Sequence, residues 1–335
     1  MKISPRNWAA AAGLALMATG PAMAEELKVS TFVVADQSLL KAVEAWGAEI
    51  EKRSGGALSF VYFPSSQMGP PNRQFDLART GVADIALFLH GFTPGRFPLT
   101  ELTYLPGVFE GVTVEQGAAA MWALSQDYLA AEHPGTHLLA VTPTGSARIF
   151  SQARFDSIES LAGRRIRHPG AVIADTYAAL GAVPVGVPPQ EMADAAQRGI
   201  VDGLGVSFQA ANDWKLEGIS DHVLDVDFGV ASFALVMNQA RYDSLPEDLR
   251  SLIDETSGEA LSRALGAATD ASEDEDRARF AEISTIISPG ADEMARFEQV
   301  FAARRDEGVA ALEADGLPAR AFFDRLESTL DSLRE

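Results

Sequence analysis

Cysteine is absent from this chain of 335 residues. Without a thiol, the protein can form no disulfide, no cysteine nucleophile and no cysteine-ligated zinc site. The G-x-S-x-G motif and the Walker phosphate-binding loop are also missing, and Gly203 and Gly205 lack the third glycine of a dinucleotide fingerprint. We therefore expect no catalytic residues and no cofactor.

Histidine is scarce, with five in the chain. His133 and His137 are four residues apart, but a proline and a glycine lie between them. This interruption disfavours a helix that carries both rings on one face, and no glutamate follows the first histidine as it does in zinc-binding helices. The sequence therefore predicts no metal site.

Positive charge is in short supply, since 27 Lys and Arg face 47 Asp and Glu, a formal net charge of −20. This excess argues against nucleic-acid binding and against docking on anionic lipid. It also surrounds the protein with a field that repels anions, screened over ~8 Å at physiological ionic strength. Binding of an anion would therefore require arginines within a cleft.

Long hydrophobic runs are missing beyond the N-terminus, which has the three parts of a secretory signal. Lys2 and Arg6 form the positive region, residues 8–18 the apolar region and residues 22–24 an A-x-A cleavage signal. The apolar region is shorter than the ~20 residues that span a bilayer. We expect residues 1–24 to be a cleaved signal peptide, and residues 25–335 to be a periplasmic protein that does not insert into the membrane.

Strand and helix signals alternate between residues 163 and 208. Strand signals at both ends and around residues 183–188 flank two helical patterns, which predicts consecutive crossover units on a parallel sheet. The apolar run of residues 83–89 predicts a further buried parallel strand. The fold class is therefore α/β, and ligands in such sheets lie beyond the carboxyl ends of the strands.

The remaining elements follow from periodicity and from glycine and proline breaks. Strands are expected at 27–34, 57–63, 137–142, 221–227 and 233–238, and helices at 39–50 (with Asp36 as N-cap), 72–80, 114–131, 292–315 and 318–333. The proline-free stretch 247–288 predicts one long helix or two nearly continuous ones. The acids at 273–276 are expected on its solvated face.

Two arginines are candidates for binding an organic anion. Arg167 lies at the end of a predicted strand and is followed by a proline and a glycine, whereas Arg148 follows another strand. The planar guanidinium matches a carboxylate in a bidentate arrangement. The alternative for each is a solvated surface arginine. Arg96, among prolines and glycines, is better explained as a donor that braces its loop.

Apolar and aromatic residues, Trp214 among them, cluster near the predicted strand ends. Candidates for the walls of the site are Phe32, Phe88, His90, Phe92, Val206 and Phe208. The alternatives are ordinary core for the aromatic rings and a structural, hydrogen-bonded role for the histidine.

Eight short segments resemble one protein family, in family order, between residues 27 and 253. They are 63–69 (FPSSQMG), 81–86 (GVADIA), 94–99 (PGRFPL), 105–109 (LPGVF), 160–167 (SLAGRRIR), 180–185 (LGAVPV), 197–203 (QRGIVDG) and 244–249 (SLPEDL). Each is weak alone, and together they resemble the periplasmic solute-binding proteins of tripartite ATP-independent periplasmic (TRAP) transporters, of the dicarboxylate-binding, DctP type.

The resemblance implies a two-lobed periplasmic-binding-protein fold with a long helix spanning both lobes and a central ligand cleft. The expected lobes are residues 25–145 plus 230–270 and residues 146–229 plus 271–335. Arg167 matches the arginine that pairs with the substrate carboxylate, and Arg148 the second arginine of many members. Val206 stands where the family often has asparagine, which favours an acid with an apolar or aromatic body.

The function implied by the resemblance is that of a receptor, not an enzyme. It would bind an organic acid and deliver it to the permease subunits of a TRAP transporter in the membrane. The alternatives are a binding protein of an ABC-type importer or of a sensory receptor, and an exported enzyme. The missing nucleophile, metal and cofactor signatures argue against the enzyme.

Overall fold

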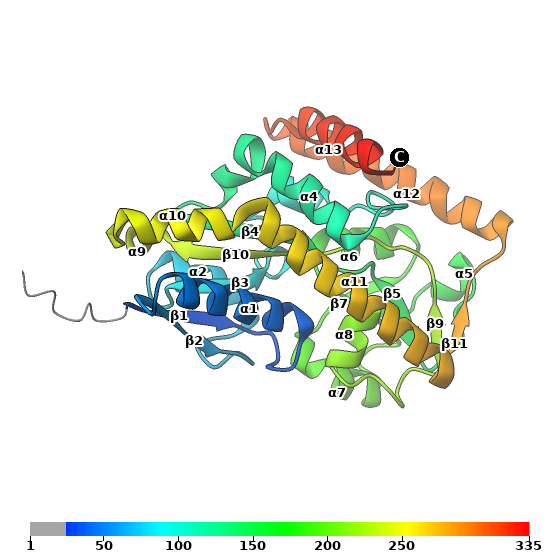
Figure 1. Cartoon of the computed structure of the whole chain (residues 1–335). Coiled ribbons are helices and arrows are strands. Elements are labelled where there is room, and N and C mark those ends of the chain that lie inside the picture. Colours follow the sequence, from blue (N-terminus) through cyan, green and yellow to red (C-terminus); the bar gives the residue numbers. More distant parts are fainter. Residues whose placement is uncertain (1–24, 335) are drawn as a thin grey trace, which may run out of the picture.

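The computed structural model describes residues 25–334, so the predicted signal peptide lies outside the described residues. Two β-sheets, each flanked by helices, form two lobes (Figure 1). The predicted α/β class, with two lobes and a long helix, is confirmed. Within residues 25–334, no helix is both long enough and apolar enough to cross a membrane.

The first sheet has five strands in the order β2-β1-β3-β10-β4. Their bounds are β1 Glu25–Thr31, β2 Leu58–Phe63, β3 Ile85–Leu89, β4 Thr136–Pro143 and β10 Ser232–Asn238. The first three are parallel, and β10 runs antiparallel between β3 and β4. All five side chains of β3 are buried, as its continuous apolar sequence predicts.

The second sheet has six strands in the order β11-β9-β5-β8-β6-β7. Their bounds are β5 Arg148–Ser151, β6 Arg165–His168, β7 Val183–Gly186, β8 Gly203–Val206, β9 His222–Leu224 and β11 Thr285–Ile287. β6 pairs in parallel with both β7 and β8, which confirms the crossover units expected between residues 163 and 208. β5 is antiparallel to its neighbours β8 and β9.

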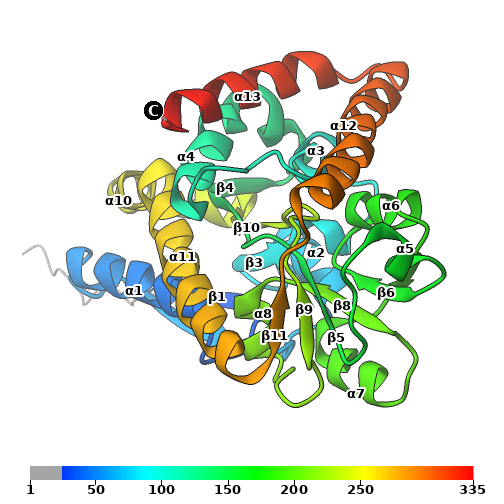
Figure 2. The same ribbon diagram turned by 90° about the vertical axis from the view of Figure 1, so that its right-hand side faces the viewer.

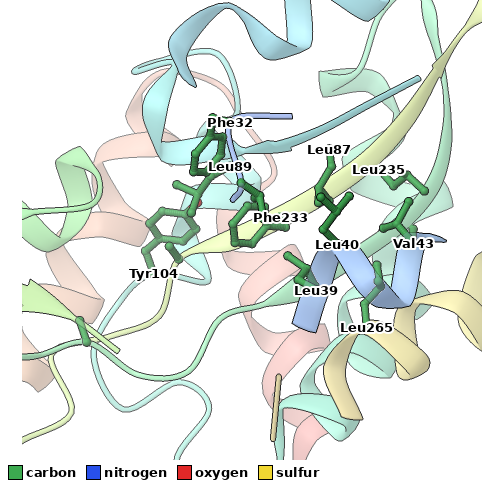
Figure 3. Close-up of a cluster of buried hydrophobic side chains, with 14 of the residues drawn as sticks. Phe32, Leu39, Leu40, Val43, Leu87, Leu89, Tyr104, Phe233, Leu235 and Leu265 are labelled. Carbon is green, nitrogen blue, oxygen red and sulfur yellow. The ribbon is translucent and has the colours of Figure 1, made fainter. Parts of the chain in front are cut away.

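Helices cover both sheets. They are α1 Ser38–Arg53, α2 Gln74–Arg79, α3 Pro98–Leu102, α4 Val114–Leu124, α5 Ile158–Leu161, α6 Ala171–Ala179, α7 Met192–Gln197, α8 Phe208–Asp213, α9 Gln239–Ser244, α10 Glu247–Thr256, α11 Gly258–Ile283, α12 Ala291–Ala314 and α13 Ala319–Arg334. Apolar side chains of α1, β3, β10 and α11 meet in the first lobe, as Leu40, Leu87, Leu235 and Leu265 show in Figure 3.

Two helix boundaries differ from expectation, and the proline-free stretch forms the second of the two expected arrangements but ends earlier than expected. The N-cap of α1 is Gln37, not Asp36, and its side chain makes no capping bond. α4 ends at Leu124 and continues as a π-helical turn, Ser125–Leu129. The proline-free stretch divides into α10 and α11 because the backbone is extended at Ser257, and it ends in a strand of β-branched residues, β11.

Two crossing segments and α11 connect the lobes. Residues 144–147 lead from β4 to β5, and residues 225–231 lead from β9 back to β10. The two segments are hydrogen-bonded to each other, since the Thr144 N–H donates to the Ala231 carbonyl (2.9 Å) and the Ala147 N–H to the Gly229 carbonyl (2.8 Å). α11 runs from α4 and β4 to α8 and β11, and so spans both lobes (Figures 1 and 2).

The C-terminal helix packs against helices of the residues expected in the first lobe, and the expected lobe division stays a prediction. That division assigns residues 271–335 to the second lobe, whereas α13 packs across α4 and α3 (Figure 2). The physical reason is its apolar stripe, because Phe322, Phe323, Leu326 and Leu330 are buried in one cluster with Met121 of α4. α12 bridges to the second lobe through α6.

Candidate functional site

A cavity of about 70 Å³ lies where carboxyl ends of strands from both sheets meet. The first lobe lines it with residues at the ends of β1 and β3 and on β10. The second lobe lines it with residues of β6, β8, α7 and α8, and the crossing segments close one side. This volume is several times the ~10–15 Å³ that a single water needs. The cavity therefore has the place in the fold where ligands of α/β proteins bind.

Arg167 is the cationic group of the cavity. It lies on β6, which runs between β8 and the edge strand β7, and is 2% exposed. Its Nε–H donates to the Val187 carbonyl and its Nη1–H to the Gly205 carbonyl, both at 3.1 Å. In the part of the chain that the structure describes, no carboxylate forms an ion pair with it. Burial lowers the pKa of Arg167 to about 10, which leaves it charged at neutral pH.

A buried cation without a counter-ion is costly unless a ligand pairs with it. The two carbonyls hold the guanidinium in one orientation and leave further N–H donors for a ligand. The structure therefore offers a charged, hydrogen-bonding anchor at one wall of an otherwise largely apolar space.

Aromatic rings also line the cavity. Phe32 packs edge-on against Phe92 (ring centroids 5.2 Å apart) and is stacked with Phe233 (5.8 Å). Figure 3 shows Phe32, Leu89 and Phe233 together at one end of the buried cluster of the first lobe. Trp214 adds an indole ring from the second lobe. These surfaces suit a flat, apolar body.

Polar side chains at the rim come from both lobes. Gln209 of α8 donates from Nε2 to the Ser38 Oγ at the start of α1 (2.7 Å), across the cleft. The N-terminus of α8 is held by Glu273 of α11, which accepts the N–H groups of Phe208 (3.2 Å) and Gln209 (2.9 Å). Contacts at the rim thus already join the two lobes.

The sequence had indicated that the acids at 273–276 lie on a solvated face, but two of them do not. Glu273 turns into the interface with α8, and burial raises its pKa. Asp276 is 6% exposed. Burial, followed by the charges of Asp213 and Glu273, raises the pKa of Asp276 to about 7. The expectation was wrong for these two because the charge pattern of α11 does not show which of its faces other helices cover in the folded protein.

Five of the residues singled out from the sequence come together at the cavity. Arg167, Phe32, Phe92, Val206 and Trp214 all line it. Their contact with a ligand stays a prediction.

The structure places Phe88 and His90 away from the cavity lining. Because side chains alternate across a strand, Leu89 turns to the cavity and Phe88 to the other face. There Phe88 packs with Phe75 (5.2 Å) and Phe97 (5.5 Å).

His90 is fully buried in a chain of hydrogen bonds. The His133 Nδ1–H donates to the Leu129 carbonyl (2.8 Å), so the His133 Nε2 accepts from the His90 Nε2–H (3.0 Å). The His90 Nδ1 then accepts from the Ser232 hydroxyl (2.8 Å). Burial lowers the pKa of both imidazoles, that of His133 to about 4. This is the structural role that was the alternative for His90.

Phe208 and Arg148 also have partners outside the cavity lining. The Phe208 ring packs edge-on against Phe150 (5.3 Å) in the core of the second lobe. The Arg148 Nε–H donates to the Asp225 Oδ1 (2.8 Å). Arg96 braces its loop as expected, through Asp76 (2.8 Å).

Sequence reasoning missed several lining residues. Gln37, Thr144, Met192 and Phe233 line the cavity without having been singled out. They stand at helix starts, on a crossing segment and on an antiparallel strand, where only the packing of the two lobes brings them together. The one available signal was Phe233, at the start of a predicted strand.

A two-lobed α/β fold with an arginine-anchored cavity between the lobes is the fold of a solute-binding protein. The family model described as "Bacterial extracellular solute-binding protein, family 7" matches residues 29–309, and the chain belongs to this family. A curated relative, the C4-dicarboxylate-binding periplasmic protein DctP of Rhodobacter capsulatus, is 26% identical over 318 residues, 92% of this chain and 94% of the relative.

Solved structures of TRAP solute-binding proteins share the fold. One from Rhodoferax ferrireducens, in complex with copurified benzoate, has a TM-score of 0.86 and 28% identity and covers 92% of this chain and 98% of its own. A marine metagenome protein specific for aromatic acid ligands, in complex with 3-hydroxybenzoate, has a TM-score of 0.88 and 25% identity. The match covers 93% of this chain and 100% of that protein. A Bordetella bronchiseptica protein with bound mandelate, at 23% identity, shows the fold alone.

Proposed function

We propose that this protein is a periplasmic receptor that binds an organic acid anion and delivers it to the permease subunits of a TRAP transporter. The observation that carries the proposal is Arg167, a buried guanidinium without a protein counter-ion among the described residues, facing an aromatic cavity between two lobes. The receptor binds and releases its ligand without chemical change.

The ligand carboxylate would accept hydrogen bonds from the free N–H groups of Arg167. Each charge-assisted hydrogen bond contributes on the order of 1.5–3 kcal/mol. Phe32, Phe92 and Val206 would contact the body of the acid. Because the cavity takes residues from both lobes, a bound acid stabilises the closed arrangement over an open one.

The body of the acid is apolar or aromatic. Three phenylalanine rings, Trp214 and Met192 line the cavity and favour such a body over a sugar acid. Two of the similar structures hold benzoate and 3-hydroxybenzoate, which supports this choice.

The lobes would move as two bodies about the crossing segments. We propose residues 25–145 plus 230–270 as the first lobe and residues 146–229 plus the C-terminal half of α11 as the main part of the second. The packing of α13 on α4 attaches the C-terminal helix to the first lobe. A signal peptide at residues 1–24 would direct export.

A thermal-shift screen of residues 25–335 against organic acids tests the proposal. An acid at 100 times its Kd should raise the free energy of unfolding by about 2.7 kcal/mol. Arg167→Ala should bind that acid at least ~100-fold more weakly, since ~1.4 kcal/mol corresponds to tenfold.

Arg165→Ala is the matched control. Arg165 lies two residues away on the same strand, but its guanidinium pairs with Asp202 at the surface. This variant should bind as wild type does. Equal binding by Arg167→Ala and wild type would contradict the site. The absence of any shift, with no acid in a mass spectrum of the denatured protein, would contradict the function.

A further inference from the structure

The backbone of Arg148 lies at the edge of the cavity, although its side chain does not line it. In the antiparallel pair of β5 and β8 it lies directly opposite Val206, a lining residue. Residues directly opposite on paired strands have their side chains on the same face of the sheet. From its backbone position alone, Arg148 would therefore be a second cation for the ligand.

Asp225 pairs with Arg148 instead. The Asp225 side chain, 12% exposed, accepts the Arg148 Nε–H at 2.8 Å. Arg277 of α11 binds the same carboxylate, through Nη2 at 2.6 Å and Nη1 at 3.1 Å. The Glu273 carboxyl, near Arg148, is a second acid of this cluster. Burial alone would raise the pKa of Asp225, but the hydrogen bonds from Arg277 and Arg148 keep it below its usual range.

The charge of Arg148 is therefore matched within the protein, whereas Arg167 at the cavity has no counter-ion among the described residues. A ligand with one carboxylate would pair with Arg167. A second carboxylate would be left against phenylalanine, methionine and tryptophan side chains without a cation, and burying an unpaired charge is costly. Freeing Arg148 for it would break the pair with Asp225.

Resting on the proposed function, we propose that the receptor selects monocarboxylates over dicarboxylates, and that Asp225 determines this specificity by holding Arg148 out of the cavity. Asp225 is thus a positioning residue that touches no ligand. The class of substrate is an acid with a single carboxylate on an apolar or aromatic body.

The test compares acids of equal shape that differ in one charge. Isothermal titration would measure benzoate and two such pairs, 3-carbamoylbenzoate with isophthalate and succinamate with succinate. Wild type should prefer the monoamide by roughly tenfold or more in at least one pair, a difference of ~1.4 kcal/mol. Asp225→Asn, which keeps the shape and removes the charge, should reduce this preference by roughly tenfold.

Two further variants separate the proposal from general damage to the site. Arg277→Gln removes the other arginine on Asp225 and should keep the wild-type preference. The double variant Asp225→Asn with Arg148→Gln should lose the gained binding of the diacid, because the gain passes through Arg148.

Several results would overturn the proposal and leave the receptor function intact. One is that wild type binds benzoate but binds the two members of each pair equally, and another is that it binds neither member of either pair. The others are an unchanged preference for the monoamide in Asp225→Asn and a loss of benzoate binding in Arg148→Gln. Failure of wild type to bind any acid, benzoate included, would instead contradict the proposed function.

Discussion

Gly205 decides how closely β8 approaches β6, and with it the position of Arg167. A Cβ at residue 205 would lie 2.2 Å from the Tyr177 hydroxyl and 2.6 Å from the Arg167 carbonyl, distances that no side chain can occupy. The absent side chain lets the Gly205 carbonyl accept from the guanidinium. The anchor of the proposed site therefore depends on a residue without a functional group.

At the residue scale, we predict that Glu101 makes the free energy of unfolding depend on pH. It is 5% exposed, and its Oε1 has no hydrogen-bond partner among the described residues. Burial, followed by the charge of Glu132, raises the pKa of Glu101 to about 8. The folded protein thus holds a proton that the unfolded chain releases near pH ~4.3. The stabilisation that comes from the protonated Glu101 is therefore complete below that pH and is lost as pH rises to about 8.

Glu101→Gln removes this loss. The free energy of unfolding of the variant, relative to wild type, should rise between pH 5 and 8 by at most ~1.4 kcal/mol per pH unit and level off above. Urea denaturation at pH 5, 7 and 9 measures it, with Glu110→Gln, an exposed glutamate nearby, as control. A difference between variant and wild type that does not change with pH would refute the assignment.

At the scale of elements, α11 shapes the cavity through α8. Glu273 accepts the first two N–H groups of α8, and that helix brings Gln209 to the cavity rim. Gly145, which lines the cavity, packs on the same carboxyl group, where a Cβ would lie 2.2 Å from the Glu273 Cδ. One side chain of the spanning helix thus supports two parts of the cavity wall.

Glu273→Ala should lower the free energy of unfolding by about 1–3 kcal/mol, because it leaves buried N–H groups unpaired. It should also weaken acid binding, since α8 loses its fixed position. Chemical denaturation and titration calorimetry measure both effects. Glu275→Ala, at an exposed position of the same helix, should change neither. Wild-type stability in Glu273→Ala would show that the cap contributes nothing.

At the scale of the whole molecule, net charge opposes the ligand. Loss of Lys2 and Arg6 with a cleaved signal peptide would take the formal net charge from −20 to −22. An approaching anion is therefore repelled until it comes within reach of Arg167. Salt shortens the range of this repulsion, since the Debye length falls from ~30 Å at 0.01 M to ~8 Å at 0.15 M.

The association rate constant of an acid ligand should therefore rise several-fold over this range of sodium chloride. The dissociation rate constant should change little, because the bound acid lies in a buried site. Stopped-flow tryptophan fluorescence, to which Trp214 of the cavity contributes, measures both, and sucrose of equal osmolality, which does not screen charge, is the control. A fall in the association rate constant with salt would show that the local arginine outweighs the overall field.

Local patterns were enough to predict the elements and part of the site. The alternation between residues 163 and 208 specifies parallel crossover units because short connections and chirality allow few other arrangements. Arg167 was found as an anchor candidate because a charged residue at the end of a buried strand is visible in the sequence. β5 and β11 were not predicted, because strands of four and three residues carry too little periodicity.

What the sequence by itself determined is the α/β class, the order of most elements and the arginine at the end of a strand. Only the tertiary structure decided which of two arginines is free, because the carboxylate that pairs with Arg148 is 77 residues away, after β9. It also decided that Leu89, not Phe88, faces the cavity. Local sequence sets the period of a strand, whereas the packing of two lobes sets which face meets the ligand.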